Sequence, residues 1–313
     1  MTFLRQVATR VQTNIPRILA RRWLGAAVAG VLLLLLAAPI AAHPANEASA
    51  VEIPFTSDNG VPMVKVMVNG KGPYTFIVDT GEEHLAVINP KIAKDLGLPQ
   101  VGMGETSDPT NNQKLQAPMF LAAGLEFGGF KAEKVEMFGL DVGLDGVVGL
   151  PIFREYLCEF QPASNRIVLR RASLPASNGQ DIFSYTTPIG IPDMEMIIAG
   201  KALRVHVDAG NPIQMSFPKS MTAGFEWASA PEKIGEAGTI ANRFSIFEGR
   251  LKTDLHLGRY VFRQPYVVVS DINGTHANFG FGFFKLFQSV SFDQKNRRVR
   301  FERDGAAIQI GPG

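Results

Sequence analysis

The sequence predicts an all-β fold of two β-barrel lobes, related by an internal duplication, with a cleft between them. Past residue 50, short apolar and β-branched runs alternate with Gly, Asn and Pro clusters, a pattern typical of strands. The clearest strands are expected at residues 63–68, 74–78, 135–138, 166–169, 260–262, 266–269 and 298–301. Long amphipathic helical patterns are absent, and one short helix is expected at residues 90–96, between Asn89 as N-cap and Gly97 as its stop.

The two-lobed prediction comes from an internal repeat. Residues 74–81 read YTFIVDTG, and residues 203–210 read LRVHVDAG. A later glycine follows an apolar segment in each copy, 70 positions after Asp79 at Gly149 and 72 positions after Asp208 at Gly280. Chance does not readily supply matched landmarks in one order at nearly equal intervals. We therefore predict an N-terminal lobe at 51–172, a polar linker at 173–180 and a C-terminal lobe at 181–313.

Composition limits the classes of partner and of stabilising bond. The formal net charge is only +2, so no nucleic-acid partner is indicated. The chain has one cysteine, Cys158, which excludes an intrachain disulfide and is expected to be a small buried side chain. The two lobes must therefore be stabilised by burial of their cores, which a chain of 313 residues allows.

Residues 1–50 are predicted to be a signal peptide or an N-terminal membrane anchor. Basic residues up to Arg22 precede an apolar run at 23–42, and small residues follow, with cleavage expected after Ala42 or Ala50. If it is not cleaved, the run is long enough to remain as an inner-membrane anchor. The rest of the chain is expected to be exported in either case: periplasmic, anchored facing the periplasm, or secreted.

These motifs resemble the pepsin/retropepsin superfamily of aspartic proteases. Each lobe in that superfamily has an apolar strand that ends in Asp-Thr/Ser-Gly, with an apolar-apolar-Gly segment beside it. The resemblance covers residues 51–303 and is strongest to the bacterial exported members, which carry both lobes in one chain. It implies retropepsin/pepsin-like β-barrel lobes and a protein or peptide substrate. Because both lobes lie in one chain, a monomer is sufficient.

The resemblance implies that Asp79 and Asp208 are the catalytic pair. Two carboxylates held close together share one proton. The ionised carboxylate can act as general base on a water molecule while the protonated one donates to the scissile carbonyl oxygen. The catalytic loops are expected to be supported by Thr80, Gly81, Ala209, Gly210, Asn211, Gly149 and Gly280.

Several of these side chains have specific expected roles. Ala209 has no hydroxyl, so Thr80 alone is expected to tie the two loops together, and the amide of Asn211 is expected to donate to Asp208. Side-chain alternation along a strand places Ile77 and His206 on the same side as the carboxylates, as walls of the substrate pocket.

Two departures from the family pattern keep a second interpretation open. Glu82 stands where a small residue is usual, and Ala209 replaces Thr or Ser. The first interpretation is an aspartic endopeptidase that cleaves an exported or membrane protein. The second is a catalytically degraded module of the same fold that binds extended peptide or a periplasmic partner.

No cofactor and no metal are expected from the motifs. A metal site at Asp79, Glu82, Glu83 and His84 has no supporting His-Glu-x-x-His or Cys pair, and Glu83 and His84 are expected to be solvated.

Overall fold

The computed structural model describes residues 50–107, 113–198, 200–239 and 242–312. The predicted signal peptide or membrane anchor lies outside these residues, except for its last residue, Ala50. No helix within the described ranges is both long and apolar enough to cross a membrane. The described chain is all-β and two-lobed, which confirms the predicted fold class.

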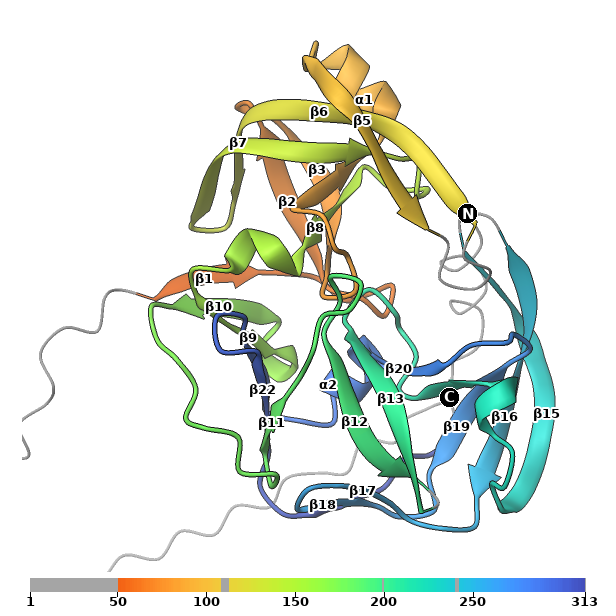
Figure 1. Ribbon diagram of the computed structural model, residues 1–313. Helices are drawn as coiled ribbons and strands as arrows, with labels where there is room; N and C mark the ends of the chain where they lie inside the picture. Colours follow the sequence, from red (N-terminus) through yellow and green to blue (C-terminus); the bar gives the residue numbers. More distant parts are fainter. Residues whose placement is uncertain (1–49, 108–112, 199, 240–241, 313) are drawn as a thin grey trace, which may run out of the picture.

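The first lobe is built on a seven-stranded sheet in the order β2-β3-β8-β4-β7-β6-β5, at the top of Figure 1. Its strands are β2 (Met63–Val68), β3 (Lys71–Asp79), β4 (Ala86–Ile88), β5 (Gln100–Ser107), β6 (Lys114–Phe127), β7 (Phe130–Gly139) and β8 (Gly146–Gly149). Most neighbours are antiparallel, but β3 pairs with β8, and β4 with β7, in parallel.

The second lobe repeats this strand order in another seven-stranded sheet, β12-β13-β20-β14-β19-β16-β15, at the lower right of Figure 1. Its strands are β12 (Asp193–Ile198), β13 (Lys201–Asp208), β14 (Ser216–Pro218), β15 (Trp227–Gly238), β16 (Arg243–Leu251), β19 (Tyr266–Ser270) and β20 (His276–Gly280). The parallel pairs also recur, between β13 and β20 and between β14 and β19. Each strand of one lobe therefore has a counterpart in the other.

A six-stranded antiparallel sheet, β1-β10-β9-β21-β22-β11, joins the two halves of the chain. Three strands come from the first half, β1 (Val51–Pro54), β9 (Leu157–Gln161) and β10 (Arg166–Arg170), and three from the second, β11 (Ile182–Ser184), β21 (Ser289–Asp293) and β22 (Arg298–Glu302). The halves meet where β9 pairs with β21. A three-stranded sheet, β17 (Leu255–Leu257), β18 (Tyr260–Phe262) and β23 (Ala307–Ile308), lies beside β12.

The helical segments are short. They are α1 (Pro90–Asp95), α2 (Phe281–Phe284) and the 3₁₀ turns η2 (Leu150–Phe153), η3 (Pro162–Ser164) and η4 (Lys219–Met221). The predicted first helix is confirmed, with the Asn89 side chain accepting from the Lys91 N–H and the C-cap at Leu96. Gly97 follows with a φ of +65°, a left-handed conformation that glycine adopts at little cost.

Phenylalanine dominates the core of the second half. Phe283 is fully buried and its ring centroid lies 4.6 Å from that of Phe279, 5.2 Å from Phe287 and 5.7 Å from Phe301. The phenylalanines of residues 279–287 are all buried and form part of the core. Cys158, on β9, is also fully buried, as expected for a small apolar side chain.

Candidate active site

The two candidate carboxylates end equivalent strands. Asp79 is the last residue of β3, and Asp208 is the last residue of β13. Each is in register with a glycine on its parallel neighbour, Asp79 with Gly149 and Asp208 with Gly280. The strand that carries each carboxylate is therefore held on one side by a second strand ending at the same level.

Both paired glycines are required by the loop that follows each aspartate. A Cβ added at Gly149 would lie 2.0 Å from the carbonyl oxygen of His84, and one at Gly280 would lie 2.2 Å from that of Asn211. Contacts this short are forbidden, so any other residue would push the loop away. The predicted supporting role of these glycines matches this geometry.

The turns after the two aspartates face each other. Gly81 N–H donates to Asp79 Oδ1 at 2.6 Å, and Gly210 N–H donates to Asp208 Oδ1 at 2.9 Å and to Asp79 Oδ1 at 3.1 Å. A Cβ at Gly210 would lie 2.2 Å from Asp79 Oδ2, and one at Gly81 would lie 2.7 Å from Asp208 Oδ1. Each carboxyl group thus occupies the space next to the glycine of the opposite turn.

This proximity changes the proton affinity of the pair. Burial raises the pKa of Asp79 well above its ordinary value, and the charge of Asp208 and a hydrogen bond with it raise the pKa further. The charge of Glu82 acts in the same direction, while the Gly81 N–H acts against it by stabilising the carboxylate. Two carboxylates that cannot both ionise easily hold one proton between them, and this proton belongs to the pair.

Thr80 provides the hydroxyl link between the lobes. Its fully buried side chain donates to the Val207 carbonyl oxygen at 2.6 Å and accepts from the Ala209 N–H at 2.8 Å. Ala209 is also fully buried and offers no hydroxyl in return. One side chain therefore satisfies two backbone groups of the opposite lobe, and it does so directly beside both carboxylates.

The side-chain amide that donates to Asp208 belongs to Asn278 and not to Asn211 as expected. Asn211 Nδ2 donates to Asn278 Oδ1 at 2.8 Å, and Asn278 Nδ2 donates to Asp208 Oδ2 at 2.5 Å. The expectation of a direct bond from Asn211 is therefore wrong, because Asn278 on β20 stands between the two side chains. Asn278 was missed, although it lies two residues before Gly280 and strand alternation places it on that glycine's face.

Asn211 and Glu82 play the same part in the two loops. Glu82 Oε1 accepts from the His84 N–H at 2.8 Å, and Asn211 Oδ1 accepts from the Ile213 N–H at 3.0 Å. In each lobe, the side chain three residues after the aspartate thus accepts from the N–H two residues further on. Glu82 therefore replaces a small family residue with a side chain that stabilises the turn.

Glu82 is also paired with His84. The ring Nδ1 of His84 lies 2.6 Å from Glu82 Oε1, and the ring stacks on Phe138 with centroids 4.4 Å apart. The hydrogen bond and charge of Glu82 raise the pKa of His84, although burial alone would lower it. The expectation that His84 is a solvated loop residue is wrong, because the aromatic contact and the carboxylate hold it against β7. Glu83 is exposed, as expected.

The two expected pocket walls differ in their surroundings. Ile77 and His206 are both partly buried and lie two residues before their aspartates. The His206 ring stacks on His276 with centroids 4.5 Å apart, and its Nε2 atom is buried without a hydrogen-bond partner. Burial and the neighbouring charge of His276 lower the pKa of His206.

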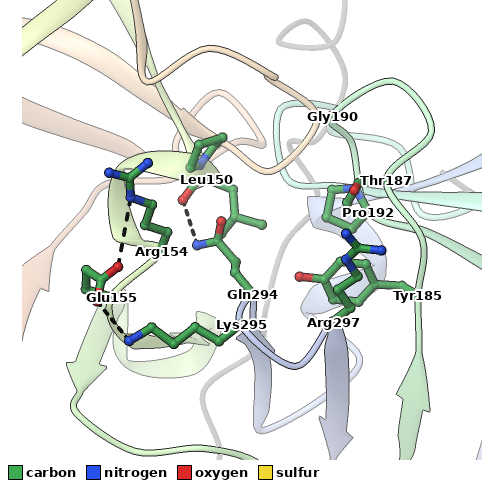
Figure 2. A pocket seen from close by; sticks show the side chains of 11 residues that line it. Leu150, Arg154, Glu155, Tyr185, Thr187, Gly190, Pro192, Gln294, Lys295 and Arg297 are labelled. Atoms are coloured by element: carbon green, nitrogen blue, oxygen red, sulfur yellow. Dashed lines mark hydrogen bonds and ion pairs between the residues drawn. The ribbon is translucent and has the colours of Figure 1, made fainter.

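A pocket that neither Asp79 nor Asp208 lines is shown in Figure 2. This pocket of about 380 Å³ is lined by residues of η2, by the segment before β12 and by the turn between β21 and β22. Glu155 forms ion pairs there with Lys295 at 2.8 Å and with Arg154 at 3.9 Å. It contains none of the site residues predicted from the sequence.

The two β lobes and their facing Asp-bearing turns agree with the predicted fold class. Residues 64–152 match the family described as aspartyl protease, which confirms the resemblance over most of the first lobe. Among solved structures, the chain is similar to basic 7S globulin from soybean, with 10% identity and a TM-score of 0.44, over 81% of this chain and 94% of that one. No curated protein matches this sequence.

The hydroxyl of Thr80 should contribute measurably to stability. Thr80→Val keeps the shape of the side chain but leaves the Val207 carbonyl and the Ala209 N–H without their partner. An unsatisfied buried polar group costs about 1–3 kcal/mol, and each kcal/mol lowers Tm by about 2–4 °C in a chain of this size. Thermal unfolding should show this loss for Thr80→Val and a much smaller one for Thr80→Ser, which retains the hydroxyl. Equal Tm values for Thr80→Val and wild type would contradict the assignment.

Asp79 should destabilise the protein at neutral pH. Because its folded-state pKa is raised, the stability it contributes is present below the ordinary aspartate pKa and is lost as the pH rises toward the folded value. Asp79→Asn should therefore raise Tm at about pH 7, where two carboxylates face each other, and gain little at about pH 3. The exposed Asp58→Asn is the control and should show no such difference. A lower Tm for Asp79→Asn at neutral pH would exclude this account.

Proposed function

We propose that the chain is an aspartic endopeptidase that hydrolyses peptide bonds of an exported or membrane protein. The observation that carries the proposal is the reciprocal seating of Asp79 and Asp208, each carboxyl group against the turn glycine of the other lobe. The match to the aspartyl protease family supports a peptidase over other hydrolases.

The proposed reaction needs one proton on the pair and one water molecule. The ionised carboxylate removes a proton from the water as it attacks the scissile carbonyl carbon, and the protonated carboxyl donates to the carbonyl oxygen. The resulting tetrahedral species collapses as the leaving nitrogen takes a proton from the dyad. Backbone N–H groups of Gly81 and Gly210 fix both carboxyl groups, so little reorganisation is needed.

The two departures from the family pattern do not argue against catalysis. Glu82 stabilises its own loop and is paired with His84, and Asn211 makes the equivalent backbone contact in the other lobe. Ala209 has no hydroxyl, but the Thr80 hydroxyl still links the lobes because it contacts two backbone groups of the second lobe. Both observations that motivated the degraded-module interpretation are therefore compatible with an active pair.

An extended polypeptide is the proposed substrate. The hairpin β5–β6 approaches the Asp79 loop, where the Thr106 hydroxyl donates to Glu83 Oε1 at 3.2 Å. Val101 and Met103 on β5, and Ile234 on the equivalent strand β15, are among the few large apolar side chains that are exposed. Exposed apolar side chains on these hairpins favour a substrate that carries apolar residues.

The test is cleavage of a peptide library by the purified full-length chain from acid to neutral pH. Wild type should cleave and be blocked by a statine-type inhibitor, while Asp79→Asn and Asp208→Asn should lose at least about 10³-fold in kcat/KM. The exposed Asp58→Asn should retain wild-type activity. Because the pKa of Asp79 is raised, activity should persist above the ordinary aspartate range and fall when both carboxyl groups ionise. Cleavage by either Asn variant at the wild-type rate would refute the mechanism.

We further propose that the enzyme acts outside the cytoplasm. The support is the order of basic, apolar and small residues over 1–50. Mass spectrometry of the protein from a bacterial host should find a new N-terminus after Ala42 or Ala50, or the intact chain in the membrane fraction. An intact, soluble cytoplasmic chain would rule the proposal out.

A further inference from the structure

A polar cluster lies beside Asp208 and takes no part in the proposed reaction. It consists of Asp193 on β12, His206 on β13 and His276 on β20, which are neighbouring strands of the second-lobe sheet. Asp193 is in register with His206, and one potential ligand atom from each of the three residues lies within 4.8 Å of the others. All three side chains therefore converge from separate strands on one point.

Two atoms of this cluster are buried without a partner. Asp193 is 1% exposed; its Oδ2 atom accepts from both Nε and Nη2 of Arg204, at 3.0 and 2.7 Å, and lies 3.2 Å from Nε2 of His276. Its other oxygen, Oδ1, has no hydrogen-bond partner, and neither does the buried Nε2 of His206. An orphaned carboxylate oxygen and an orphaned imidazole nitrogen are each costly alone, but a cation between them would satisfy both.

The fold itself does not require polar residues at these positions. The equivalent pair in the first lobe is Met63 on β2 and Ile77 on β3, which are in register in the same way as Asp193 and His206. The same backbone arrangement is thus filled by apolar side chains in one lobe and by a carboxylate and an imidazole in the other. The contacts with Arg204 and His276 account for Oδ2 of Asp193, but they leave Oδ1 of Asp193 and Nε2 of His206 unexplained.

We propose that Asp193, His206 and His276 form a zinc site. Two imidazoles and one carboxylate favour a transition metal over calcium or magnesium, which prefer oxygen ligands. Three protein ligands with a fourth position left for water or another group are a common zinc arrangement. The proposed ligands include neither Asp79 nor Asp208, so the site does not depend on whether the chain cleaves peptides.

Groups around the cluster are placed to orient these ligands. Arg204 holds one oxygen of Asp193 and leaves the other free, and the Nδ1 atom of His276 lies 2.9 Å from the Thr275 hydroxyl. A proton on Nδ1 shared with that hydroxyl leaves Nε2 as the metal-binding atom of His276. Such outer contacts are typical of metal-binding histidines and carboxylates.

Binding requires a local adjustment. Ligand atoms of tetrahedral zinc lie about 3.3 Å apart, whereas those of the cluster lie within 4.8 Å of one another, so the cluster contracts by at most about 1.5 Å on binding. The two imidazole rings are stacked at an interplanar angle of 16°, and one must turn so that both nitrogen atoms point at the ion. His276 is the more exposed partner, with 31% of its side chain accessible, and its turn would shift its contacts with Thr275 and Asp193. Zinc would then join β12, β13 and β20, the last two of which carry Asp208 and Asn278.

The experiment is equilibrium dialysis of the full-length, tag-free chain against zinc, with bound metal measured by atomic emission. Wild type should take up one zinc ion per chain, and zinc should raise its Tm relative to chelator-treated protein. His276→Gln and His206→Gln should weaken binding at least tenfold and lose the zinc-dependent rise in Tm. His256→Gln, an exposed histidine on β17, should bind as wild type does.

A second variant separates metal binding from folding. The double change Asp193→Met and His206→Ile copies the first-lobe pair, so it should fold, retain a cooperative thermal transition and bind no zinc. The proposal is overturned if wild type takes up no zinc, or if the histidine and double variants bind as much as wild type. It is also overturned if His84→Gln alone abolishes uptake, because the ion would then lie at Glu82. Cleavage activity enters none of these readouts, so this proposal and the endopeptidase proposal can fail separately.

Discussion

The arrangement of the whole site depends on one buried hydroxyl between two backbone turns. Thr80 donates to the Val207 carbonyl and accepts from the Ala209 N–H, and these two residues flank Asp208. These two hydrogen bonds therefore fix the position of one turn relative to the other. That constraint brings Asp79 and Asp208 close enough to share a proton, and the proton sharing gives a carboxyl pair its chemistry at moderate pH.

The loop after each aspartate has the same backbone geometry in both lobes but is stabilised by different side chains. The carbonyl oxygens of Glu82 and His84 cover Gly149, and those of Asn211 and Ile213 cover Gly280 in the same way. The geometry requires a glycine on the neighbouring strand. At the third residue after the aspartate it requires only a side chain that can accept a hydrogen bond from the N–H two residues further on. A carboxylate and an amide both meet that requirement. The backbone geometry is therefore the same in the two lobes although the residue at this position differs.

Sequence periodicity and the repeat were sufficient to predict the all-β fold and the α1 helix, and the resemblance to aspartic proteases implied the pairing of Asp79 with Asp208. They could not predict contacts that depend on which strands become neighbours. Asn278 and His276 lie about 70 residues from Asp208 along the chain, and only the parallel pairing of β13 with β20 brings them beside it. The bond between Asn278 and Asp208, and the contact of His84 with Phe138, are tertiary features of this kind.

The surroundings of the two carboxylates are consequently unequal. Asp79 receives two backbone N–H groups and is close to the negative charge of Glu82, whereas Asp208 receives one N–H and the amide of Asn278. The strand that carries Asn278 also carries His276, and the strand that carries Asp208 also carries His206. A change in charge or position within the histidine cluster would therefore reach Asp208 through both strands. The first lobe has the apolar pair Met63 and Ile77 at the equivalent place. Any regulation of the pair by a bound cation would act from the second lobe.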